Sequence, residues 1–182
     1  HRRGLELGAT VLAALEQMPP GILQGRLDLE LVNVVADMGN RQIELKYFEA
    51  AQATYRKALD LHDRMGGILP EQAVLRATLL HQLGRVAQER RQWAEAEDCY
   101  QQALATKLKF KDRKGAASTY HQLGIVAQEQ RQWPQAEGFY KQALAIKLEF
   151  NNRYEQAATY HQLGRVAQLQ RQLPQAEGYY QQ

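Results

Sequence analysis

The chain has 182 residues, of which 45% are hydrophobic, and its 23 lysines and arginines nearly balance 20 aspartates and glutamates. This composition suits one folded domain or repeat array rather than a disordered tail. The formal charge of only +3 argues against a dedicated nucleic-acid surface, and no run reaches the roughly 18 apolar residues that a membrane helix needs. We therefore expect neither nucleic acid nor a membrane as a partner.

Cys99 is the only cysteine. An internal disulfide is excluded, which fits a reducing compartment, and we expect a cytoplasmic protein. The chain begins at His1 without a methionine and ends at Gln182 inside a repeat, so we expect an excerpt of a longer protein.

The first expected element is a helix within residues 1–21. Leu5, Leu12 and Leu15 can form a helical stripe, which ends at Met18-Pro19-Pro20-Gly21. We interpret this segment as an N-terminal helix and linker that precedes an array over residues 22–182. It could equally be the last helix of an upstream domain.

The rest of the chain is repetitive. A shift of 40 residues aligns residues 81–120 with residues 121–160, and 25 of the 40 positions are identical. A third copy starts at His161, and a diverged copy around Gly39 precedes the others. A fixed period of this length indicates a repeat architecture. The expected repeats are about 27–66, 75–114, 115–154 and a truncated 155–182.

Each repeat is predicted to be a pair of helices. Apolar residues follow helical spacing, and no segment alternates as a strand would. Pro134 and Pro174 stand where a second helix begins, a position that tolerates the missing amide hydrogen. Breaks between helices are expected at Arg91-Gln92-Trp93, Lys111-Asp112 and Asn151-Asn152.

Three glycines recur at one place in the first helices, although glycine costs about 0.5–1 kcal/mol relative to alanine inside a helix. We expect them to let an alanine of the second helix approach closely, while a tyrosine fills the wider gap beyond. The glycines are Gly84, Gly124 and Gly164, the alanines Ala96, Ala136 and Ala176, and the tyrosines Tyr100, Tyr140 and Tyr180.

The pattern Leu80-x2-Leu83-Gly84-x2-Ala87 followed by Ala96-x3-Tyr100-x2-Ala103 resembles the tetratricopeptide repeat. The resemblance covers roughly residues 27–182. The 40-residue period looks like the variant in kinesin light chain and Pins-type adaptors, and similar arrays look like sensor regions of bacterial signalling ATPases. The resemblance implies an all-α fold, a right-handed α-solenoid of helix-turn-helix hairpins whose concave groove binds a protein or peptide.

The resemblance also implies that a partner meets the polar residues beside each first-helix glycine. Histidine and arginine four residues apart share one helical face, and a guanidinium suits carboxylates, so we expect an acidic partner. The opposing interpretation is a solvated helix face that gene duplication has copied. The expected groove residues are Asn40, His81, Arg85, Gln88, Glu89, His121, Gln128, Glu129, His161, Arg165 and Gln168.

No catalytic, cofactor or metal site is expected. The sequence lacks a glycine-rich phosphate loop, a nucleophile motif and a paired-acid constellation. Histidines one hairpin apart cannot easily share an ion, because neighbouring helices lie about 8–10 Å apart and a zinc–nitrogen bond is about 2 Å. Cys99 is expected to be a packing residue, and Trp93, Trp133 and Leu173 are expected to wedge the hairpin turns.

The leading functional hypothesis is a non-catalytic protein-interaction scaffold. One alternative is a sensor or regulatory region of a larger signalling ATPase or effector enzyme, and another is a self-assembling spacer. Because exposed solenoid ends are adhesive, we expect self-association through Tyr179 and Tyr180. We also expect residues 161–182 to be the least stable part of the array.

Overall fold

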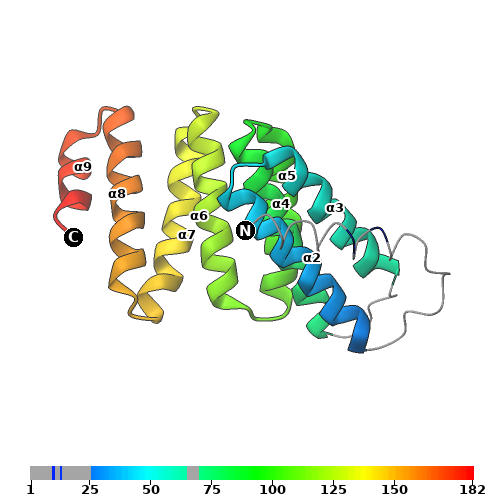
Figure 1. Cartoon of the computed structure of the whole chain (residues 1–182). Helices are drawn as coiled ribbons and strands as arrows, with labels where there is room; N and C mark the ends of the chain where they lie inside the picture. The colour runs from blue at the N-terminus through cyan, green and yellow to red at the C-terminus, as the bar shows by residue number, and fades with distance from the viewer. Residues whose placement is uncertain (1–9, 11–12, 14–25, 65–69) are drawn as a thin grey trace. The chain divides into compact units, whose positions relative to one another are not determined.

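The computed structural model describes residues 10, 13, 26–64 and 70–182 (Figure 1). These residues form helices and no strand, which confirms the all-α prediction. The helix expected within residues 1–21 lies outside the described residues, apart from Thr10 and Ala13, which are helical. The helices are α2 (Arg26–Glu44), α3 (Phe48–Arg64), α4 (Pro70–Glu89), α5 (Trp93–Lys109), α6 (Arg113–Glu129), α7 (Trp133–Glu149), α8 (Arg153–Leu169) and α9 (Leu173–Tyr180).

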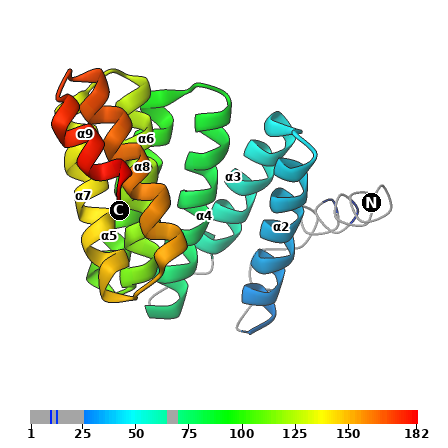
Figure 2. The ribbon, with the colours of Figure 1, turned by 90° about the vertical axis from the view of Figure 1, so that its left-hand side faces the viewer.

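The chain divides into two compact units, residues 1–92 and 93–182. In the first unit, α2 packs against α3 and α3 against α4. In the second unit, α5 to α9 follow one another, and each helix packs against the next (Figures 1 and 2). None of the described helices is both long and apolar enough to cross a membrane.

The helix pairs are joined by tight turns that use a left-handed residue. At the α6–α7 turn, Arg131 has φ of 60°, and the amide of Gln132 donates to the carbonyl of Ala127 at 2.8 Å. This bond closes the helix end as a Schellman motif does, although glycine usually occupies the left-handed position. The breaks expected at residues 111–112 and 151–152 are confirmed, and so is the one near residue 91, although α5 already begins at Trp93. Among the residues that the structure describes, the other non-glycine residues with a left-handed backbone are Lys46, Arg91, Lys111, Asn151 and Arg171.

The helix starts also follow from the sequence. Asp112 caps α6 by accepting from the amide of Gly115 at 2.9 Å, and Asn152 caps α8 by accepting from the amide of Glu155 at 3.3 Å. Pro134 lies in the first turn of α7, as expected from its missing amide hydrogen. Pro174 takes the same place in α9.

The recurring glycines make room for tyrosine, whose ring lies directly against the glycine and not in a wider gap beyond it as expected. A β-carbon added to Gly124 would lie 2.5 Å from Cε1 of Tyr140, and one added to Gly164 would lie 2.4 Å from Cε1 of Tyr180. The diverged copy repeats this arrangement, because a β-carbon on Gly39 would lie 2.7 Å from Cζ of Tyr55. The aromatic ring therefore fills the space that any larger residue at the glycine would need.

Two further packing predictions can be compared with the structure. Cys99 is buried, only 5% exposed, as expected of a packing residue. Trp133 packs against the core cluster that contains Tyr140, Leu163 and Val166, so it does anchor its turn. The expectation fails for Leu173, which is 63% exposed.

Candidate functional site

In the second unit, four of the predicted partner-facing residues are exposed. They are Glu129 of α6 and His161, Arg165 and Gln168 of α8. Nη1 of Arg165 donates to Oε1 of Gln162 at 3.4 Å, one helical turn earlier. Among the residues that the structure describes, no carboxylate forms an ion pair with Arg165.

The other two predicted residues of this unit are largely covered. The ring of His121 packs on that of Tyr140, with centroids 5.4 Å apart, and its Nδ1 lies 3.4 Å from Oγ1 of Thr159. Burial, assisted by the charge of Lys147, lowers the pKa of His121 to about 4. Gln128 is only 5% exposed and accepts a hydrogen bond from the Tyr140 hydroxyl at 3.4 Å. Both side chains therefore support Tyr140 from inside the array.

The first unit contains a similar exposed arginine. Arg85 and Glu89 of α4 are exposed, whereas His81 and Gln88 are half-buried. Nη1 of Arg85 donates to Oε1 of Gln82 at 2.9 Å, which repeats the arginine–glutamine contact of α8.

Asn40 is held among three helices. Its Oδ1 accepts from the hydroxyl of Tyr55 at 2.7 Å and from Nε2 of Gln82 at 3.2 Å. The amide oxygen thus joins α2 to α3 and α4, and it has little capacity left for a partner.

Each exposed arginine lies close to a buried tyrosine of the preceding hairpin. Burial raises the pKa of the Tyr140 hydroxyl, and the positive charge of Arg165 opposes that rise. Burial likewise raises the pKa of Tyr55, against the charge of Arg85. In both units the exposed arginine therefore acts electrostatically on the buried tyrosine of the preceding hairpin.

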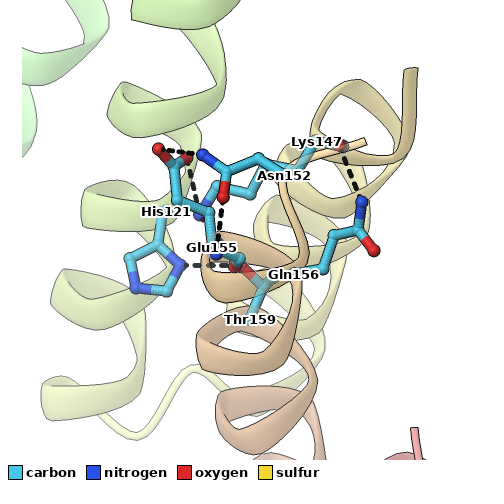
Figure 3. A network of polar contacts seen from close by, with 6 residues as sticks. All are labelled: His121, Lys147, Asn152, Glu155, Gln156 and Thr159. Atoms are coloured by element: carbon cyan, nitrogen blue, oxygen red, sulfur yellow. Dashed lines mark hydrogen bonds and ion pairs between the residues drawn. The ribbon is translucent and has the colours of Figure 1, made fainter. Parts of the chain in front are cut away.

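Sequence reasoning missed a set of buried basic groups. Lys147 is 6% exposed, and its Nζ donates to Oγ1 of Thr159 at 3.0 Å and to the carbonyl of Glu155 at 3.5 Å (Figure 3). Lys107 is 4% exposed and donates to Oγ1 of Thr119 at 3.1 Å. Burial lowers the pKa of both lysines. Each follows a core tyrosine by seven residues, about two helical turns, and this spacing was the available signal.

In the first unit, a histidine replaces the lysine. His62 follows Tyr55 by the same seven residues, is 3% exposed, and places Nε2 2.7 Å from the carbonyl oxygen of Gln72. A basic side chain at this position thus joins a second helix to the first helix of the next repeat in both units.

A second repeated contact joins successive hairpins through their turns. Gln130 donates to Glu97 at 3.4 Å, and Gln170, 40 residues later, donates to Glu137 at 3.2 Å. In the first unit Arg90 donates to Gln52 at the corresponding positions. These contacts fix the register between repeats.

A pocket of about 160 Å³ opens between the first turns of α6, the end of α7 and the start of α8. Its basic groups are Lys114, whose Nζ lies 5.1 Å from the Phe150 ring centroid, and Lys147. Glu155 faces them, with Oε1 bonded to Nδ2 of Asn152 at 2.9 Å (Figure 3). The lining residues are Lys114, Ala117, Ser118, Lys147, Phe150, Asn152 and Glu155.

The described residues contain no group of three or more histidines, cysteines, aspartates or glutamates that could hold a metal ion. What these surfaces offer is charge and hydrogen bonding. The exposed arginines present planar donors, and the pocket presents ammonium, hydroxyl and amide groups.

Comparison with solved structures shows the same architecture in other proteins. BtubC (BKLC) from P. vanneervenii matches with a TM-score of 0.82 at 19% identity, over 98% of this chain and 69% of that one. RapI matches with a TM-score of 0.81 at 14% identity, over 99% of this chain and 48% of that one. Nearly identical kinesin light chain TPR-like repeats from Podosopora anserina match with a TM-score of 0.75 at 17% identity, over 99% and 83% of the two chains.

At these identities the likeness shows the fold alone, and the chain spans about half the length of RapI. A search of curated proteins found no match. A family model for the tetratricopeptide repeat matches residues 75–149 and 116–182, together 108 of the 182 residues. The chain therefore belongs to the tetratricopeptide repeat family.

Proposed function

We propose that the array is a non-catalytic interaction module in which each unit binds an acidic segment of another protein through the exposed face of a first helix. The observation that carries this proposal is the exposure and the hydrogen bonding of Arg85 and Arg165. Each is exposed, each is steadied by a glutamine three residues earlier, and neither has a carboxylate partner among the described residues. A guanidinium in this state retains donors for a bidentate carboxylate.

The surroundings of Arg165 favour a polar ligand. His161 and Gln168 flank it on α8 at four and three residues, so all three lie on one helical face. Gln168 already accepts from the Tyr180 hydroxyl at 3.4 Å, which leaves its amide donors for a partner. Acidic side chains or backbone carbonyls of an extended segment match these donors.

Capture followed by reconstitution tests this proposal. The wild-type chain and an Arg85→Ala/Arg165→Ala variant serve as baits in lysate, and a retained protein is purified and titrated by calorimetry. We expect the double variant to weaken its binding by tenfold or more, and the wild-type affinity to fall with salt. The control is Arg64→Ala/Arg153→Ala, which removes two other exposed arginines. Equal affinity of both variants for the purified partner would exclude this face.

A second proposed property is self-association through α9. Tyr180 is 47% exposed and Leu173 is 63% exposed, whereas Tyr140, at the same repeat position as Tyr180, is fully buried beside α8. Light scattering of the wild-type chain and of a Leu173→Gln variant tests this property. A wild-type chain that stays strictly monomeric at high concentration would exclude it.

The proposed location is the cytoplasm. A sequence with a single cysteine, Cys99, cannot form an internal disulfide, and this is consistent with a reducing compartment.

A further inference from the structure

We propose that the pocket between α6 and α8 is a subsite that receives one carboxylate side chain of the acidic segment. This inference rests on the proposed function, because the pocket lies at the end of the same helical face. Lys114 and Ser118 precede Ile125 and Glu129 on α6 by steps that keep them on one side of the helix. The pocket would therefore fix the position of a segment that also contacts α8.

The charges of the pocket favour an anion. Lys114 and Lys147 supply two ammonium groups against the single carboxylate of Glu155. That carboxylate is already engaged, since Oε1 accepts from Asn152 at 2.9 Å and Oε2 lies 3.9 Å from Nζ of Lys147. The first turn of α8 adds the positive end of a helix dipole. The pocket therefore carries a net positive charge, and the carboxylate of Glu155 is partly neutralised by its partners.

The donors that remain are placed at the mouth of the pocket. Ser118 is exposed, and among the described residues its hydroxyl makes no hydrogen bond. Lys114 is exposed, and the contact that the structure gives its ammonium is with the face of the Phe150 ring. A carboxylate between these two side chains would gain a charge-assisted bond from Lys114 and a hydroxyl bond from Ser118.

The floor and wall explain the preference for a carboxylate on a short aliphatic stem. Lys147 closes the floor, where its ammonium is held by Thr159 and the carbonyl of Glu155 (Figure 3). Ala117 and Phe150 supply apolar surface for methylene groups. The volume of about 160 Å³ is close to that of protein cavities that bind a benzene-sized molecule, so an aspartate or glutamate side chain can fit.

The test uses a small probe, so that it does not depend on the identity of the partner. N-acetyl-glutamate N-methylamide is titrated into isotope-labelled protein, and its amide shifts are compared with those for the glutamine analogue and for inorganic phosphate. We expect saturable shifts at Lys114, Ser118 and Asn152 for the glutamate probe, at least fivefold weaker binding of the glutamine analogue, and weaker binding of phosphate.

Two variants test the pocket without disturbing buried Lys147. Lys114→Gln removes the mouth cation, and Ser118→Leu fills the mouth with an apolar side chain; both positions are exposed. Each substitution should weaken the binding of the glutamate probe at least threefold. The matched control is Lys141→Gln on α7, an exposed lysine outside the pocket that pairs with Glu137 at 2.7 Å.

The outcomes separate this inference from the function on which it rests. Equal shifts with the glutamate and glutamine probes, or tighter binding of phosphate, would overturn the carboxylate subsite. So would wild-type affinity in both Lys114→Gln and Ser118→Leu. If the probe binds here while Arg85→Ala/Arg165→Ala leaves partner binding unchanged, the subsite stands and the proposed arginine face fails.

Discussion

The phenol ring of Tyr140 occupies the space beside Gly124 where another residue would carry its side chain. An added β-carbon at Gly124 would lie 2.5 Å from Cε1 and 2.6 Å from Cδ1 of that ring. The ring is fully buried and cannot swing outward without breaking the core it shares with Leu163 and Val166. The glycine is therefore required by packing, despite its cost to the helix.

This relationship predicts opposite effects of the same substitution at two glycines. Gly124→Ala should lower the free energy of unfolding by about 1–2 kcal/mol, because overpacking exceeds the gain in helix propensity. Gly138→Ala on α7 should raise it by roughly 0.5–1 kcal/mol, since nothing lies within 4 Å of an added β-carbon there.

Urea denaturation of the two variants measures both effects. Tyr140→Leu, alone and combined with Gly124→Ala, provides the control for a steric cause. Loss of the buried ring is itself destabilising, but the added alanine should cost less in the Tyr140→Leu background than in the wild type. A Gly124→Ala variant as stable as wild type would show that the ring can move aside.

The repeat pattern explains why the helices and turns could be predicted. Identical spacing of small and large residues over 40 positions marks helix pairs, and Pro134 and the breaks mark their ends. The partner of Gly124 could not be predicted in the same way. Ala136 and Tyr140 lie four residues apart on one face of α7, and spacing alone does not say which of them opposes the glycine.

The candidate site was predictable only in part for a related reason. Arg165 is exposed, as a polar residue on a helix face should be, but His121 is covered because α8 packs beside it. Lysine is a residue type that usually lies at the surface, yet α8 buries Lys147 against Thr159. Such burial results from the packing of one helix on another, and the hydrophobic periodicity of a single helix does not predict it.

Because Lys147 is buried, we expect the stability of the fold to be sensitive to substitution of Thr159. Thr159→Val removes the hydroxyl that accepts from Lys147 Nζ at 3.0 Å and leaves a buried ammonium short of one partner. We expect a loss of about 1–3 kcal/mol in the free energy of unfolding. Thr106→Val is the control, because among the described residues the Thr106 hydroxyl bonds only the carbonyl of Gln102 on its own helix, and the substitution should cost under about 0.5 kcal/mol.

A double variant shows whether the charge causes the loss. Lys147→Met combined with Thr159→Val replaces both partners by apolar groups. The stability of the double variant should therefore be nearer to that of the wild type than the stability of Thr159→Val alone. Thermal denaturation gives the comparison. Simple additivity of the two losses would contradict a direct interaction between these side chains.

The left-handed turn residues predict a stabilising substitution. Arg131 has φ of 60°, a conformation that costs a residue with a side chain about 1 kcal/mol or more. Arg131→Gly should therefore raise the free energy of unfolding by roughly 0.5 kcal/mol after the entropy of glycine in the unfolded chain is counted. Gln135→Gly, on an exposed site within α7, should instead lower stability by about 0.5–1 kcal/mol. A loss of stability in Arg131→Gly would show that the arginine side chain contributes to the turn.

The position of His121 predicts a specific dependence of stability on pH. Its pKa is lowered from 6.5 to about 4, first by burial and then by the charge of Lys147. The unfolded chain therefore binds a proton at this ring before the folded chain does. The contribution of neutral His121 is complete above about pH 6.5, and it declines as the pH falls from there towards 4, by about 3 kcal/mol in total.

Denaturation midpoints between pH 7.5 and 4 for wild type and His121→Gln measure this contribution. The variant should be less stable at neutral pH, because the ring packs 5.4 Å from the Tyr140 centroid, but its stability should change less on acidification. His161→Gln replaces the equivalent histidine of the next repeat, which is exposed, and must leave the contribution of His121 in place. Parallel pH curves for wild type and His121→Gln would mean that the ring is protonated inside the folded array, and that Thr159 and Tyr140 tolerate the charge.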